Sequence, residues 1–309
     1  MTAGRVCVVG ATGYLGSRVV AELRARSIPV VAILSDRSCE RDQRGLLALG
    51  VTLAFVDASR IESYGEALLD VRVAISCMAS ANTNVDATDD FWAIDRDANI
   101  RFGVEAVEAG VAHVILVATF EGRASRHVTA FSNAKEVAVD AIAAACRDEG
   151  VAFTVIRPTA YFSDLTNRAF NSVLKHGQHN VLGQGVHRIN PIDGRDVAVF
   201  IADCLHNPAK AGREHQVGGP ETFSFLEIGI LAADVIGQPG TLKIRKIPIW
   251  SLRLLAAMAS AAGLVSRRFR RSAAMLEWMI YAGTHDAVAP VCGARKLRDD
   301  FLSKLKKSH

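Results

Sequence analysis

Short apolar segments alternate with helical segments through the first 160 residues of the chain. The apolar segments, rich in Val and Ile, lie at residues 5–10, 29–34, 51–57, 71–78, 112–119 and 151–158. Between them apolar residues recur at spacings of three and four, the period of a helix with one buried face. Continuous apolar strands joined by helices are typical of a parallel sheet covered on both faces. The sequence therefore predicts an α/β protein with a doubly wound parallel sheet.

A glycine-rich turn joins the first apolar segment to the first helix, with glycine at every third position. At such a junction the glycines allow a tight turn, a close approach of the backbone to a pyrophosphate, and packing of the helix on the strand. The free N–H groups of the helix N-terminus attract the same anion. A turn without any ligand is the simpler alternative. We predict a dinucleotide-binding Rossmann domain whose turn contacts the cofactor through Gly10, Thr12, Gly13, Tyr14, Leu15 and Gly16.

The residues after the second apolar segment select the cofactor. An acid there binds the ribose of NAD(H), whereas a base accepts the 2′-phosphate of NADP(H). Asp36 is at a suitable distance, but the apolar spacing puts Leu34 where the acid normally points, with Ser35 as a hydroxyl donor and Arg37 as a cation. Asp57 follows the third segment, where it would bind the adenine amino group or cap a helix. We expect NADP(H) rather than NAD(H), unless Asp36 and Arg37 form a solvated pair.

Two regions are expected along the chain. Residues 1–160 form the NAD(P)-binding Rossmann domain in this interpretation, and segment 186–206, which contains a further strand and helix, returns to it. Residues 161–309 are richer in helical patterns and form a smaller, mostly helical C-terminal lobe that binds substrate. The longest apolar stretch has 12 residues, which is too short to span a bilayer.

Composition excludes several classes of function. The 309 residues include 36 Lys and Arg against 32 Asp and Glu, a balance without a sequence-wide signature for nucleic acid. Six cysteines lie far apart without a C-x-x-C pair, so we expect neither a metal site nor a disulfide framework. The N-terminus runs straight into the first strand without a signal-peptide pattern. These features predict a cytoplasmic protein, with its oligomeric state left open.

Several segments in order, VVGATGYLGSRVV, AGVAHVILVAT, NAKEVAVDAI, FTVIRP, RINPIDGRDVA and VGGPETFSFLEI, together resemble the atypical short-chain dehydrogenase/reductase superfamily. The chain is most similar to its NmrA-like branch, which includes divinyl chlorophyllide reductases and isoflavone reductase-like proteins. The resemblance covers essentially the whole chain and implies the Rossmann fold. It does not fix the chemistry, because this branch contains reductases, sensors and structural subunits.

The resemblance also implies where an active site would lie. The superfamily typically uses a Ser, and a Tyr and Lys spaced Y-x-x-x-K, in which the phenol exchanges a proton and the ammonium lowers its pKa. Here Phe131 replaces the Tyr, Lys135 matches the Lys and Thr119 matches the Ser. Lys135 would bind the nicotinamide ribose or protonate a developing enolate, unless it is exposed on a helix that begins after Asn133. Tyr161 would replace the missing phenol or pack in the core.

The segment 247–271 combines an apolar, small-residue helix with four arginines. It would cover the substrate pocket with a solvated basic turn, or lie on an anionic membrane surface as a peripheral contact. Both readings are compatible with a small-molecule apolar substrate. We expect no nucleic acid partner.

The function expected from these residues is NADP(H)-dependent reduction of a bulky conjugated or cyclic metabolite. Phe131 weakens the case for simple carbonyl reduction and favours hydride addition to an activated C=C bond. The same residue supports an alternative, a non-catalytic NmrA-like protein that holds NADP as a redox signal or structural cofactor. A tailoring enzyme of a biosynthetic cluster that uses the nucleotide for a non-reductive step is a third possibility.

Overall fold

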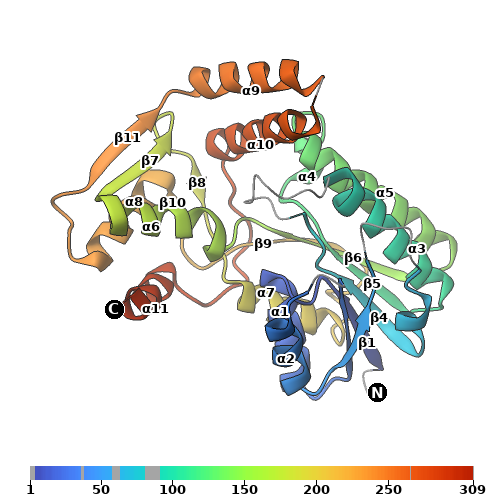
Figure 1. The fold of residues 1–309 in the computed structure, drawn as a ribbon. Coiled ribbons are helices and arrows are strands. Elements are labelled where there is room, and N and C mark those ends of the chain that lie inside the picture. Colours follow the sequence, from blue (N-terminus) through green and yellow to red (C-terminus); the bar gives the residue numbers. More distant parts are fainter. Residues whose placement is uncertain (1–3, 36–37, 58–62, 81–90, 265, 309) are drawn as a thin grey trace. The chain divides into compact units, whose positions relative to one another are not determined.

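Seven strands between residues 5 and 217 form a parallel sheet with helices on both faces (Figure 1). We describe a computed structural model, in which residues 4–35, 38–57, 63–80, 91–264 and 266–308 are placed. The strand order is β3-β2-β1-β4-β5-β6-β9. The strands are β1 (Arg5–Val9), β2 (Val30–Leu34), β3 (Thr52–Phe55), β4 (Val71–Ser76), β5 (His113–Val117), β6 (Ala152–Pro158) and β9 (Glu214–Val217).

The strand order reverses between β1 and β4, which pair in parallel with Val9 opposite Ser76. In doubly wound sheets the crevice at such a switch point, outside the carboxyl ends of the strands, binds the ligand. The predicted Rossmann fold is therefore confirmed. Strand β9, rather than a strand within 186–206, is the last to join the sheet.

Helices cover both faces of this sheet and are apolar on the side that packs against it. The largest core cluster joins strand residues such as Cys7, Ile33 and Val114 to helix residues such as Phe102 and Ile142. The helices are α1 (Tyr14–Ala25), α2 (Glu40–Ala48), η1 (Gly65–Leu68), η2 (Trp92–Ala98), α3 (Asn99–Glu108), α4 (Gly122–Ser125), α5 (Ala130–Asp148) and α7 (Gly194–Cys204).

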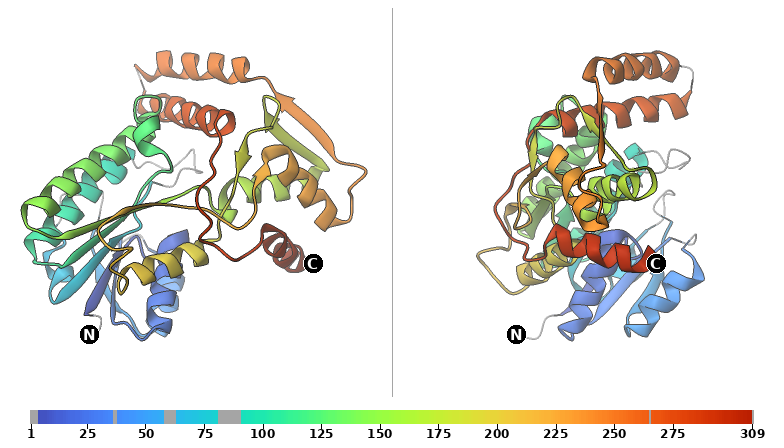
Figure 2. Two further views of the ribbon diagram at one scale, coloured as in Figure 1. Left: turned by 180° about the vertical axis from the view of Figure 1, so that it is seen from behind. Right: turned by 90° about the vertical axis from the view of Figure 1, so that its left-hand side faces the viewer.

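The chain divides into two compact units. The first comprises residues 1–126, 131–157 and 197–215; the second comprises 127–130, 158–196 and 216–309. The second unit is mostly helical, as Figure 2 shows from two further sides. Its elements include η3 (Phe162–Thr166), α6 (Asn167–His176), α8 (Phe225–Ile236), α9 (Ile249–Gly263), α10 (Arg267–Thr284) and α11 (Leu297–Ser308), with β7 (Gln178–Leu182), β8 (Arg188–Ile189), β10 (Phe223–Ser224) and β11 (Lys243–Ile247).

The second unit has a core of its own. In it, the ring centroids of Phe170 in α6 and Phe301 in α11 are 5.0 Å apart. Its short strands form two ribbons, β10 with β8 and β11 with β7. Helix α8 begins with a capping box, since the Ser224 hydroxyl accepts from the Glu227 N–H while the Glu227 carboxylate accepts from the Ser224 N–H. No helix within the described ranges is both long and apolar enough to cross a membrane.

Candidate nucleotide site and buried lysine

The turn after β1 requires glycine at positions 10 and 16. Gly10 has a φ of +76°, and a Cβ there would lie 3.0 Å from the backbone of Cys77. A Cβ at Gly16 would lie 2.0 Å from the Gly10 carbonyl oxygen, so α1 packs against the turn only because this side chain is absent. The Gly13 N–H donates to the same oxygen at 3.0 Å. The sequence pattern therefore forms a tight cradle at the switch point.

The N-terminus of α1 suits an anion. Its N-cap, Gly13, provides no side chain to bond the first amides, and its first turn contains no acid. Gly13 is exposed, Thr12 is half-buried and Leu15 is buried. The Arg18 guanidinium lies 3.8 Å from the centroid of the Tyr14 ring, a cation one turn into the helix. Donor amides, a nearby cation and a cradle without Cβ atoms fit the pyrophosphate of a dinucleotide.

The other predicted cofactor residues lie at the same edge of the sheet. Ser35 follows β2 directly and its carbonyl accepts from the Ser38 N–H at 2.9 Å. Asp57 stands two residues after β3 and is 5 % exposed. Arg37 lies outside the described residues. The contacts of these residues with the cofactor remain predictions.

Lys135 is buried beside a carboxylate. It lies in α5, its side chain is 4 % exposed, and its Nζ stands 3.0 Å from the Asp95 Oδ1. The same ammonium donates to the Met78 carbonyl oxygen, just beyond β4. The thiol of Cys77, next to Met78, has a pKa raised to about 12 by burial, opposed by the charge of Lys135. The lysine is therefore fixed at the carboxyl end of β4.

A polar network holds Asp95 in turn. Its second oxygen, Oδ2, accepts from the Ser80 N–H at 3.1 Å and from the Ser80 hydroxyl. Asp95 lies in the π-helix η2. Directly after this helix, the Asn99 side-chain amide donates to the Ile94 carbonyl oxygen at 2.9 Å. Asn99 also accepts from the Ser76 hydroxyl at 2.6 Å. Single π-helical turns inside α-helices occur often at functional sites.

The sequence interpretation missed Asp95, Ser80 and Asn99. None of them belongs to a recognisable motif, and Asp95 is 40 positions from the lysine that it contacts. The only available signal was a carboxylate directly after four apolar residues, FWAI. Such a residue is buried only when a charge partner exists, so tertiary structure was needed to find it.

A second buried ion cluster supports Thr119. The Arg157 guanidinium, 1 % exposed, donates to both carboxylate oxygens of Glu136 and, at 2.6 Å, to Glu214. It also donates to the Thr119 carbonyl oxygen at 2.8 Å. Burial lowers the pKa of the arginine, but its two carboxylates outweigh burial and raise it. Within the described residues, the Thr119 Oγ1 is buried without a hydrogen-bond partner.

The helix that carries Lys135 begins earlier than expected. The sequence predicted a start after Asn133, whereas α5 begins at Ala130 and places Phe131 one turn before the lysine. The alternative of an exposed Lys135 is therefore wrong, because the side chain faces the interior of the first unit. Tyr161 belongs to the second unit, where it caps η3 and pairs with Ile192 through a backbone bridge.

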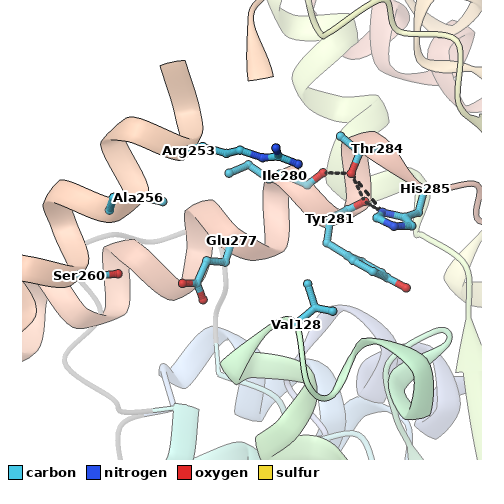
Figure 3. Close-up of a pocket in the computed structure, with 10 residues that line it drawn as sticks. Val128, Arg253, Ala256, Ser260, Glu277, Ile280, Tyr281, Thr284 and His285 are labelled. Atoms are coloured by element: carbon cyan, nitrogen blue, oxygen red, sulfur yellow. Dashed lines mark hydrogen bonds between the residues drawn. The ribbon is translucent and has the colours of Figure 1, made fainter. Parts of the chain in front are cut away.

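The second unit contains a cavity of about 360 Å³ beside α9 and α10. Figure 3 shows Arg253, Ala256 and Ser260 on α9 and Glu277 and Tyr281 on α10 around this space. Burial raises the pKa of the Glu277 carboxyl. The remaining lining residues are Val128, Ala257, Ile280, Thr284 and His285. The cavity is mostly apolar with a few polar groups, as small-molecule pockets usually are.

Metal chemistry finds no support in the described part of the chain, which holds no group of three or more His, Cys, Asp or Glu side chains able to bind an ion. All six cysteines are free.

Comparisons with known proteins identify the family of the chain. A family described as NAD(P)H-binding matches residues 10–208. The chloroplastic divinyl chlorophyllide a 8-vinyl-reductase of Oryza sativa subsp. indica is 32 % identical over 268 residues, which cover 81 % of this chain and 64 % of that protein. The enzyme of the same name from Cucumis sativus is 29 % identical over 253 residues, covering 77 % and 59 %. The chain thus spans about six-tenths of the length of these curated relatives.

Among solved structures, that of AtPrR2 with NADP+ and (+)pinoresinol has a TM-score of 0.72 at 16 % identity, covering 97 % of this chain and 98 % of that one. At this identity the likeness establishes the fold. The family match covers most of the chain and begins at the first glycine of the cradle. The chain therefore belongs to the NAD(P)H-binding family, in agreement with its resemblance to atypical short-chain dehydrogenases/reductases.

Proposed function

We propose that the chain is an NADPH-dependent reductase of a conjugated C=C bond in a bulky, apolar, cyclic metabolite, with vinyl-substituted tetrapyrroles as the first substrates to test. One observation carries the proposal: a buried lysine held by a carboxylate stands at the carboxyl end of β4, in a site where Phe131 replaces the usual phenol. Such a site lacks the proton donor that carbonyl reduction uses. The names of the two plant relatives, both vinyl-reductases, point to the same chemistry.

Lys135 acts in this proposal as a positioned hydrogen-bond donor. An ammonium has three N–H groups. The Lys135 ammonium donates to the Met78 carbonyl and stands 3.0 Å from the Asp95 Oδ1 as an ion pair, so an N–H remains for a hydroxyl of the nicotinamide ribose or an oxygen of the substrate. Because the neighbouring group is a carboxylate rather than a second cation, the geometry favours this role over that of general acid.

Bound NADPH would supply a hydride to the electron-poor end of the alkene. The electron pair of the double bond then moves onto the neighbouring carbon, into the conjugated system, and that carbon takes a proton from water. The chain orients the substrate and shields the reacting atoms. Thr119 suits the orienting role, because its buried hydroxyl has no partner among the described residues and its backbone is fixed by Arg157. Tyr161 is a second candidate, from the second unit.

The preference for NADPH rests on the end of β2. Leu34 is 2 % exposed, and the apolar spacing of β2 assigns it the position at which an acid would bind the ribose of NAD(H). Ser35 follows it as a hydroxyl donor to a 2′-phosphate. The guanidinium of Arg37 would complete this subsite.

The test begins with titrations of the purified protein with NADPH and with NADH, followed by fluorescence. Turnover is then measured with divinyl tetrapyrroles and simple conjugated enones, in the wild type and in Lys135→Ala. We expect tighter binding of NADPH and its oxidation only when a conjugated substrate is present. Tight binding without turnover would support the non-catalytic redox sensor, and binding of neither nucleotide would refute both functions.

A further inference from the structure

Helix α9 exposes its largest apolar side chains. Trp250, Leu254 and Met258 are 68 %, 56 % and 61 % exposed. At 100° per residue they occupy one side of the helix, over more than two turns, and Leu255 at 49 % widens this stripe. A helix of a globular protein normally buries residues of this kind. We call these four residues the α9 stripe.

The buried residues of α9 are small and lie outside the stripe. The helix contacts α10 through small residues, Ala256 and Ala259, which are 6 % and 8 % exposed. A Cβ at Gly263 would lie 3.0 Å from the Arg270 Cα, so the two helices approach closely where the side chain is absent. The cavity lies on another side of α9, lined by Arg253, Ala256 and Ser260. The large apolar residues are thus left for something outside the hairpin.

The stretch of sequence that contains the stripe carries basic residues and no acidic ones. Between Asp234 and Glu277 the chain has 42 residues with eight Lys and Arg and no Asp or Glu. The remaining 28 basic residues are set against 32 acidic ones, so the positive charge of the protein is concentrated here. Lys243, Arg245 and Lys246 of β11, directly before α9, are all exposed.

We propose that the α9 stripe docks on an anionic lipid bilayer, with the helix lying in the interface. An apolar face with basic side chains beside it, on a helix that does not span the membrane, is the pattern of interfacial helices. Basic residues near the surface add attraction to anionic headgroups. This inference is independent of the proposed reductase activity and of nucleotide binding.

A second copy of the chain fits the stripe less well. A two-fold interface through α9 would set the same surface against itself and bring two acid-free, basic segments together. Those like charges would repel each other. An anionic bilayer instead offers apolar interior and negative charge side by side.

The test is sedimentation of the full chain with vesicles of phosphatidylcholine, alone or mixed with phosphatidylglycerol. We expect binding to the mixed vesicles, weakened by salt, and at least about tenfold weaker binding to phosphatidylcholine alone. The triple variant W250S/L254S/M258S should reduce binding to the mixed vesicles by at least about tenfold. The variant K243E/R245E/K246E should abolish the preference for anionic lipid.

A matched control removes three apolar side chains elsewhere in the second unit, V186S/I230S/V288S, which are 61 %, 50 % and 47 % exposed in the wild type. It should bind vesicles like the wild type. NADPH titration and the unfolding midpoint confirm that each variant is folded. The proposal is overturned if the wild type does not sediment with mixed vesicles, if the control and stripe variants lose binding equally, or if the stripe variant only converts a dimer to a monomer.

Discussion

The Lys135 ammonium and the Asp95 carboxylate form an ion pair of 3.0 Å in which the side chains are 4 % and 0 % exposed. The pair ties α5 to the π-helix η2 and to the end of β4, through the Met78 carbonyl. Each charge is kept in the interior by the other, since an isolated buried charge is costly. The same pair thus orients the lysine and stabilises the contact between α5, η2 and the end of β4.

Removal of one partner should therefore destabilise the protein more than removal of both. Asp95→Asn or Lys135→Met alone should lower the free energy of unfolding by about 3–5 kcal/mol, because a buried charge is left without its counter-charge. The double variant should cost less than either single variant, because it leaves no unpaired buried charge. Urea unfolding of the four proteins measures this coupling. Additive costs would show that the two charges do not depend on each other.

The same four proteins separate positioning from stability. At temperatures where all are folded, Asp95→Asn should raise the Kd for NADPH less than Lys135→Met does, because Asp95 only orients the donor. Fluorescence titration gives both values. If Asp95→Asn weakens binding more than Lys135→Met, the lysine is not the group that reaches the nucleotide.

The positions of the strands along the chain and the glycine cradle could be predicted from sequence because both are local. Apolar runs mark the buried strands, and the spacing of Gly10, Gly13 and Gly16 follows from the geometry of one turn. The start of α5 was placed too late, since Ala130 and Phe131 give no capping signal. Asp95 could not be found, because its burial depends on a residue distant in the chain. A sequence motif does not show contacts between residues that are distant in the chain, so site residues held by such contacts are missed.

Gly16→Ala should disrupt the cradle. Its Cβ would lie 2.0 Å from the Gly10 carbonyl oxygen, so α1 must move away from β1. We expect the Kd for NADPH to rise at least about tenfold, equivalent to about 1.4 kcal/mol. Gly45→Ala, in the exposed helix α2 with no atom within 4 Å of the new Cβ, is the matched control. It should leave binding unchanged and stabilise the protein by about 0.5–1 kcal/mol. Equal effects of both variants would contradict this account.

Gly122→Ala should separate the Arg157 and Glu136 side chains. The new Cβ would lie 2.1 Å from the Glu136 Oε1 and 2.7 Å from the Arg157 Nη1, and both groups are buried. Partial loss of this ion pair should cost about 3 kcal/mol, at the low end for a broken buried pair. Thermal unfolding against the wild type and Gly45→Ala measures it. An unchanged midpoint would mean that the cluster moves aside without cost.

Acid should destabilise the first unit through His113. Its Nε2 lies 2.7 Å from the Thr154 Oγ1, the side chain is buried, and burial lowers its pKa from 6.5 to about 4. As the pH falls, His113 therefore takes up a proton near pH 6.5 in the unfolded chain, but only near pH 4 in the folded protein. Stability is complete above pH 6.5 and falls as the pH drops through this window, by up to about 3 kcal/mol.

The variant His113→Gln removes this titration and should flatten the dependence of unfolding free energy on pH between 6.5 and 4. Part of the slope will remain, because burial also lowers the pKa of His179 in the second unit. His206→Gln, at an exposed position, is the control and should keep the full slope. Urea unfolding at a series of pH values gives the three curves. Parallel curves for the wild type and His113→Gln would show that this histidine is charged in the folded protein, and that burial does not govern its proton.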